Sequence, residues 1–131
     1  MKVGVHIALW MKTWQDDIVP YIETAARLGF DGVELSLLGM TDDDIARVRK
    51  TLQENNLEVT CTTGLNMQQD ITSDDSDVRK EGMKYLEHSI KTVAALGSSL
   101  LSGVIYAPWG KRIMQHREER WERSVEALKA V

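Results

Sequence analysis

Strand-like and helix-like segments alternate four times along this chain, and that alternation constrains its fold more than any other feature. The apolar runs typical of strands cover residues 3–9, 31–37, 57–62 and 100–106. Each run precedes a stretch whose apolar residues recur at helical spacing. The first run is nearly continuous, which is typical of a strand buried on both faces of a parallel sheet. The pattern therefore predicts parallel strands joined by right-handed helical crossovers.

Local signals mark where several of the expected helices begin and end. Gly29 and Gly97 follow the last periodic residues of the first and third helices, where glycine commonly closes a helix in the left-handed conformation. Thr41 and Asp44 have the spacing of a capping box at the start of the second helix, and Ser76 is the expected N-cap of the third. The fourth helix has no such terminator and no following strand, an ending typical of a chain cut within or just after its fourth unit.

The length of 131 residues suits one domain with its own core but not a full (βα)8 barrel, which needs about 250 residues. No linker or low-complexity tract interrupts the pattern, so we expect a single domain over residues 1–131. We predict an α/β fold of four parallel strands with outer helices, the (βα)4 half of a TIM barrel.

Composition and motif searches exclude several functional classes. A net charge of −4 gives no reason to expect a nucleic acid partner. No segment has the length and hydropathy of a signal peptide or a membrane span, and the single cysteine, Cys61, suits a packing role in a reducing cytoplasm. Phosphate-binding loops, dinucleotide-binding glycine motifs and the His-Glu-x-x-His zinc motif are absent, so a nucleotide-dependent enzyme is disfavoured.

Several segments resemble one family of sugar enzymes. The segments are residues 4–10 with Trp14, 25–34, 63–65, 73–79, 102–109 and 120–126. Together they are similar to the N-terminal half of the ketose 3-epimerases (tagatose/psicose 3-epimerase type), within the xylose-isomerase-like TIM barrels. The Leu-Gly-Phe-Asp-x-x-Glu pattern is common to the wider group. The Trp10/Trp14 pair and the Tyr-x-x-Trp pattern after the fourth strand point to the epimerase branch.

The resemblance implies metal-dependent chemistry that lies outside these four units. Family members bind one divalent ion, manganese, magnesium or cobalt, through two glutamates, an aspartate and a histidine on the fifth to eighth strands. The same two glutamates move a proton at the carbon beside the ketose carbonyl. None of these ligands can be assigned within four strands, so we expect the isolated chain to be inactive and to bind no metal tightly.

The resemblance also implies part of a sugar pocket, at the C-terminal ends of the strands where barrel sites form. The family positions that wall the substrate are matched here by His6, Trp14, Gly64, Leu65, Tyr106 and Trp109. Tyrosine is common in the family where this chain has His6, so the substrate is defined only as a ketose-like sugar.

Each candidate residue also has a simpler interpretation. A lone histidine in a buried strand, such as His6, is more often a hydrogen-bonded core residue than a ligand. For Trp109 we favour the pocket wall over an ordinary loop tryptophan, and for Trp14 both interpretations stay open. Glu34 is an acid within an apolar strand, where it is either a base with a raised pKa or a carboxylate held by a neighbouring donor. We favour the second role for Glu34, a supporting group behind the site.

The expected half barrel would expose the edges of its first and last strands, where backbone groups lack partners. We therefore expect two copies to associate through these edges as a homo-oligomer. The alternative to a sugar isomerase or epimerase is a non-catalytic half-barrel scaffold or assembly module.

Overall fold

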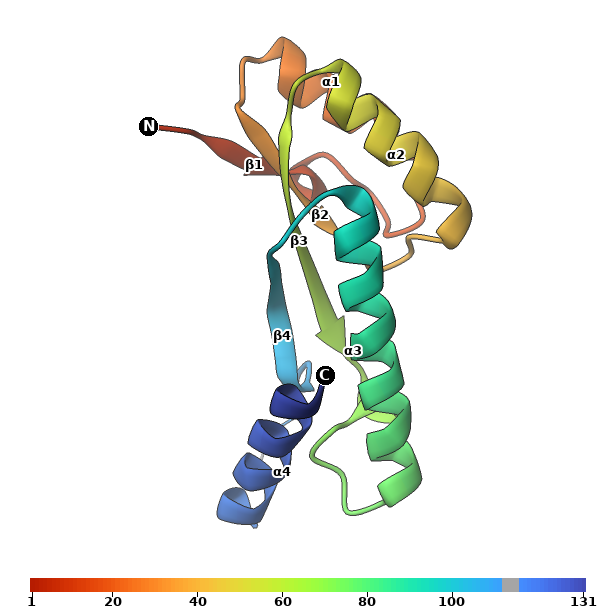
Figure 1. Cartoon of the computed structure of the whole chain (residues 1–131), viewed down its shortest axis with the longest axis vertical. Coiled ribbons are helices and arrows are strands. Elements are labelled where there is room, and N and C mark those ends of the chain that lie inside the picture. The colour runs from red at the N-terminus through yellow and green to blue at the C-terminus, as the bar shows by residue number, and fades with distance from the viewer. Residues whose placement is uncertain (112–115) are drawn as a thin grey trace. The chain divides into compact units, whose positions relative to one another are not determined.

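Strands and helices alternate in the computed structural model, which describes residues 1–111 and 116–131 (Figure 1). The pairs β1–β2 and β2–β3 are parallel, and the sheet order β1-β2-β3-β4 follows the chain. The predicted α/β class is therefore confirmed. The strands are β1 (Gly4–His6), β2 (Gly32–Ser36), β3 (Glu58–Leu65) and β4 (Leu101–Pro108). The helices are α1 (Val19–Arg27), α2 (Asp42–Glu54), α3 (Ser76–Leu96) and α4 (Arg117–Ala130), with short 3-10 turns η1 (Ile7–Leu9) and η2 (Met67–Gln69).

The chain divides into two compact units, and each has a core of its own. The first unit comprises residues 1–62 and 90–102, and the second comprises residues 63–89 and 103–131. The expectation of a single domain stays a prediction. The first core includes Ile7, Ile22, Leu35, Val48, Leu52, Cys61 and Val93. The second core contains Leu65, Ile71, Leu86 and Ala127.

The strands of the first unit are apolar on one face only. On β2, Val33 and Leu35 are buried in the core, whereas Glu34 between them is only half-buried. Successive strand residues point to opposite faces. The apolar residues therefore face the helices, and the intervening polar and glycine residues share the other face. The expectation that the first strand is apolar on both faces is therefore wrong, because His6 and Gly4 lie on the polar face.

Two strand ends lie three residues from those predicted, and the other strand boundaries differ by one or two residues. The first strand ends at His6, because its Nδ1 accepts the backbone N–H of Ala8 at 3.1 Å and the chain turns into η1. The third strand runs on to Leu65, three residues beyond the predicted end. The backbone pairing of Leu65 with the chain after β4, where its carbonyl accepts the N–H of Trp109 at 2.9 Å, explains this extension.

The helix signals are largely confirmed. Gly29 and Gly97 have φ values of 83° and 89°, as expected for residues that close a helix. Asp44 accepts both the backbone N–H of Thr41 at 3.0 Å and its hydroxyl at 2.7 Å, and these bonds lower the pKa of Asp44. Ser76 was wrongly predicted as an N-cap, since it is the first residue of α3.

The capping carboxylate of α3 belongs to the preceding residue. Asp75 Oδ1 accepts the backbone N–H of Asp77 at 2.8 Å, the bond that a capping side chain makes. Among the helices of the described residues, none combines the length and apolar character needed to cross a membrane.

Cys61 is fully buried in the first core. Burial, together with the negative charge of nearby Glu34, raises the pKa of the Cys61 thiol to about 11. The thiol is therefore neutral near pH 7 and acts as a small apolar side chain, as predicted.

Gly82 provides a test of the packing in the second unit. It lies inside α3, and a Cβ there would overlap the carbonyl oxygen of Gln69 and come within 2.8 Å of Cγ2 of Ile71. Alanine normally stabilises a helix interior over glycine by about 1 kcal/mol. Here we expect Gly82→Ala to lower the free energy of unfolding by about 1–3 kcal/mol instead, because overpacking dominates.

Urea denaturation followed by circular dichroism measures this change. Glu87→Ala on the exposed side of the same helix is the control and should stay within about 0.5 kcal/mol of the original. A Gly82→Ala chain as stable as the original would show that this packing is wrong.

Candidate functional site

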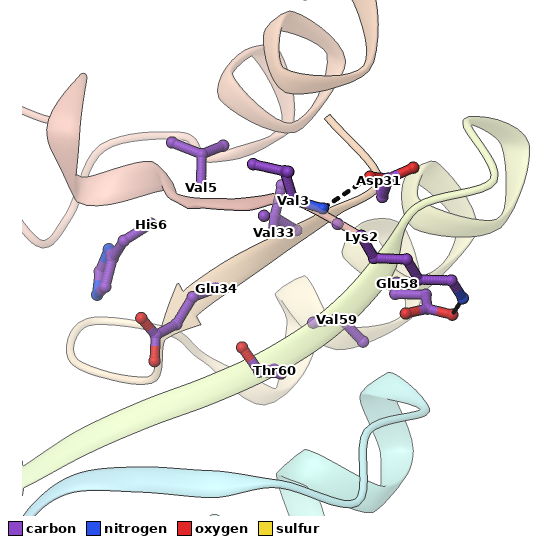
Figure 2. Close-up of a pocket in the computed structure, with 12 residues that line it drawn as sticks. Lys2, Val3, Val5, His6, Asp31, Val33, Glu34, Glu58, Val59 and Thr60 are labelled. Carbon is purple, nitrogen blue, oxygen red and sulfur yellow. Dashed lines mark hydrogen bonds and ion pairs between the residues drawn. The ribbon is translucent and has the colours of Figure 1, made fainter. Parts of the chain in front are cut away.

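A row of polar side chains crosses the open face of the first three strands. The register sets His6 beside Glu34 and Glu34 beside Thr60. Figure 2 shows these three side chains projecting to the same side of the strands, with Val5 on the opposite side. They line a hollow of about 320 Å³. This arrangement follows from parallel pairing, which places register partners of adjacent strands on one face.

His6 presents a hydrogen-bond donor to this hollow. Its Nδ1 accepts the backbone N–H of Ala8 at 3.1 Å, so this nitrogen carries no proton. A neutral imidazole then carries its proton on Nε2. The side chain is half-buried and lines the hollow, as Figure 2 shows.

Glu34 lies beside His6 as a half-buried carboxylate. Its Oε1 accepts the hydroxyl of Ser102 on β4 at 3.2 Å. The Ser102 hydroxyl is therefore a neighbouring donor to Glu34, and the supporting role of Glu34 stays a prediction. Sequence reasoning did not identify Ser102 as that donor, because the two residues are 68 positions apart and only the order of strands in the sheet brings them together.

Trp14 lies in the loop after η1, against the loop that follows β2. Its side chain is 44% exposed, and it lines a hollow of about 170 Å³ together with Ser36 and Gly39. Gly39 has φ 79°, and a Cβ there would overlap the backbone carbonyl of Trp14, so the close approach of the two loops requires glycine. This places Trp14 near the C-terminal end of β2.

Tyr106 and Trp109 belong to the second unit, at the C-terminal end of β4. Their side chains are 60% and 75% exposed, so both offer aromatic surface to a ligand or a partner. Leu65 differs, because its side chain is 1% exposed within the second core. Gly64 is half-buried, and a Cβ there would meet only Val104 O, at 3.9 Å, so this backbone does not by itself require glycine.

The loop that carries Trp109 is anchored by a buried ion pair. Asp70 is 2% exposed and pairs with Lys111 Nζ, while the N–H and hydroxyl of Thr72 donate to it at 2.8 and 2.6 Å. Burial raises the pKa of Asp70, but the hydrogen bonds from Lys111 and Thr72 outweigh it and lower the pKa overall. No motif in the sequence indicates this pair, which joins residues from two different loops.

Trp121 adds another exposed aromatic side chain to the second unit. It is 71% exposed on α4 and lines a largely apolar hollow of about 520 Å³ with Tyr106 and Ala107. Ser124 fixes the helix here by donating its hydroxyl to the carbonyl of Tyr106 at 2.7 Å. Helical spacing predicts Trp121 on one apolar face of this helix with Val125 and Leu128, but its side chain is exposed, because exposure depends on how α4 packs.

The seven candidate residues divide between the two units. His6, Trp14 and Glu34 lie in the first unit, where His6 and Glu34 are adjacent. Gly64, Leu65, Tyr106 and Trp109 lie in the second, where Leu65 and Trp109 share a backbone hydrogen bond. Among residues 1–111 and 116–131, no three His, Cys, Asp or Glu side chains converge as metal ligands.

Comparison with known proteins identifies the relatives of this chain. A protein-family model described as "Xylose isomerase-like TIM barrel" matches residues 22–131. The D-psicose 3-epimerase of Ruminiclostridium cellulolyticum is 29% identical and aligns with 100% of this chain and 46% of its own length. The L-ribulose 3-epimerase of Methylomonas sp. (strain DH-1) is 33% identical, over 98% of this chain and 45% of its own length.

Solved structures agree with the sequence relatives. A crystal structure of a D-psicose 3-epimerase in the presence of D-fructose matches with a TM-score of 0.89 at 27% identity, over 99% of this chain and 47% of that one. The chain spans about half the length of the curated relatives it matches. These findings confirm both the resemblance and the (βα)4 half of a TIM barrel.

The buried ion pair generates a prediction about stability and pH. Lys111→Met leaves the Asp70 carboxylate buried without its cation, and we expect it to cost about 3 kcal/mol of unfolding free energy at pH 7. Because the folded-state pKa of Asp70 is lowered, its contribution is present above the ordinary carboxyl pKa of about 3.9 and is lost as pH falls through the lowered value. The gap between the two proteins should therefore narrow below about pH 4.

Denaturant titrations at several pH values measure this gap. Lys80→Met, at an exposed position on α3, is the matched control and should change little at any pH. A gap that does not depend on pH would contradict the assigned role of the ion pair.

Proposed function

Because the chain belongs to the xylose isomerase-like TIM barrel family, we propose that it forms part of a ketose 3-epimerase, to which it contributes one side of the sugar pocket. The observation that carries this proposal is the alignment of ketose 3-epimerases along essentially the whole chain. The fold adds support, since the exposed Tyr106 and Trp109 lie at the C-terminal end of β4, where barrel enzymes bind ligands.

The proposed pocket wall has polar and aromatic parts. His6 would donate a hydrogen bond to a sugar hydroxyl, and Trp14, Tyr106 and Trp109 would contact the apolar C–H faces of the sugar. Gly64 and Leu65 would contribute backbone to the wall, because the Leu65 side chain is committed to the second core.

The described residues fit sugar binding better than proton transfer. Epimerisation at C3 needs a base on one face of the carbon and an acid on the other. The divalent metal implied by the family, manganese, magnesium or cobalt, needs several convergent donors, and the described residues provide no such set. This chain is therefore assigned a binding role and no metal-dependent step. We further propose that it acts in the cytoplasm.

The second candidate is a non-catalytic half-barrel scaffold or assembly module. The exposed Tyr106, Trp109 and Trp121 favour it, because three large aromatic side chains exposed on one unit are typical of a surface that another protein covers. β1 and β4 also end the sheet, and no other strand in the described part of the chain pairs with their outer edges. A second copy of the chain would satisfy both features.

The decisive test of catalysis is epimerisation of D-fructose by the 131-residue chain with added manganese, over a wide range of protein concentrations. We expect no turnover at any concentration and no stoichiometric manganese binding by calorimetry, because the described donor groups do not converge. A full-length ketose 3-epimerase serves as the positive control. Turnover that rises steeply with concentration would show instead that assembled chains build a complete site.

Sedimentation velocity tests the association of two copies. We expect the chain to sediment as a dimer or larger species at micromolar concentration, and the paired change Tyr106→Glu with Trp121→Glu to weaken association at least about tenfold, because it puts charge on the exposed aromatic surface. Trp14→Glu, on the first unit, is the matched control. A monodisperse monomer at every concentration would rule out the assembly.

A further inference from the structure

Glu34 has unused capacity to accept hydrogen bonds. An ionised carboxylate offers about four lone-pair sites, and the hydroxyl of Ser102 occupies one of them at 3.2 Å. Within residues 1–111 and 116–131, the structure pairs Glu34 with this hydroxyl rather than with a lysine or arginine. A half-buried carboxylate gains from further donors, because each one replaces water that burial has removed.

His6 supplies the complementary group on the adjacent strand. Its Nδ1 is occupied by the N–H of Ala8, which leaves Nε2–H as a donor without an acceptor among residues 1–111 and 116–131. The parallel register sets His6 directly beside Glu34, and adjacent strands are about 4.8 Å apart. Figure 2 shows both side chains on the open side of the strands, beside Thr60.

We propose that His6 and Glu34 form a donor–acceptor pair that binds two neighbouring hydroxyl groups of a sugar. Nε2–H of His6 donates to the oxygen of one hydroxyl, and the carboxylate of Glu34 accepts the O–H of the next. Glu34 then contacts the ligand itself, a larger role than the supporting one we favoured from the sequence. The choice of a ketose as ligand rests on the proposed function.

The role of Ser102 follows from this geometry. Its hydroxyl holds one carboxylate oxygen of Glu34, so the second oxygen is directed toward the ligand by a fixed neighbour rather than by a flexible side chain. Glu58 lines the same hollow but is exposed and paired with Lys2. Glu58 has no role in the proposed pair, so it provides a control carboxylate in the same hollow.

The test is a D-fructose titration of the isotopically labelled 131-residue chain, followed by NMR. We expect D-fructose to change the chemical shifts of the His6 side-chain nitrogens and of the Glu34 carboxyl carbon. Before sugar is added, the imidazole nitrogen chemical shifts should report the proton on Nε2. Glu34→Gln and His6→Phe should each weaken binding about fivefold or more, since each removes one strong hydrogen bond. Glu58→Gln removes an unrelated carboxylate, so its affinity for D-fructose should stay within about twofold of the original.

The amide spectrum of each variant shows whether it is folded. If only one of Glu34→Gln and His6→Phe folds, its affinity for D-fructose still tests the proposed pair. Shifts confined to Tyr106 and Trp109, with both variants binding as tightly as the original, would overturn the pair but leave the proposed function intact. An absence of D-fructose-induced shifts anywhere in the chain would overturn both.

Discussion

Side-chain alternation along three parallel strands is the constraint on which the rest of this structure depends. The buried apolar residues of β2, Val33 and Leu35, pack toward the helices, so the residue between them must face the other way. Parallel pairing then sets His6, Glu34 and Thr60 in one row. A shift of one residue in register would move this polar row into the helix-covered core, where unpaired charge is costly.

The second unit solves a different problem, which is to hold a loop that bears an exposed tryptophan. Apolar packing contributes little at Trp109, whose side chain is 75% exposed. The loop is instead held by polar contacts to buried groups, the Leu65 carbonyl and the Asp70 carboxylate. Buried ion pairs add modest net stability but penalise alternative arrangements strongly, so they suit a loop that needs one conformation.

Binding and proton transfer make different demands on a barrel. A sugar pocket needs donors, acceptors and aromatic surfaces, all of which the four βα units provide. Chemistry at C3 needs acid and base groups on opposite faces of one carbon, and strands on one side of a barrel cannot easily supply both. Under the proposed function, the four βα units contribute one side of a sugar pocket.

The sequence by itself determined the order of the elements and most of their ends, because these depend on local chemistry. Gly29 and Gly97 adopt the positive φ that glycine tolerates at the ends of helices, and Thr41 with Asp44 caps α2 through contacts three residues apart. The family resemblance, too, could be found from residue patterns alone. It did not depend on any knowledge of contacts between distant parts of the chain.

Only the tertiary structure decided which polar groups meet. The Glu34–Ser102 and Asp70–Lys111 pairs join residues 68 and 41 positions apart, and no local pattern encodes them. The N–H of Ala8 ended the first strand early, and the packing of α4 left Trp121 exposed. In each case the outcome depends on the order and register of strands or on the packing of helices. Strand order, register and helix packing are set by the burial of all the apolar side chains together rather than by neighbours in the sequence.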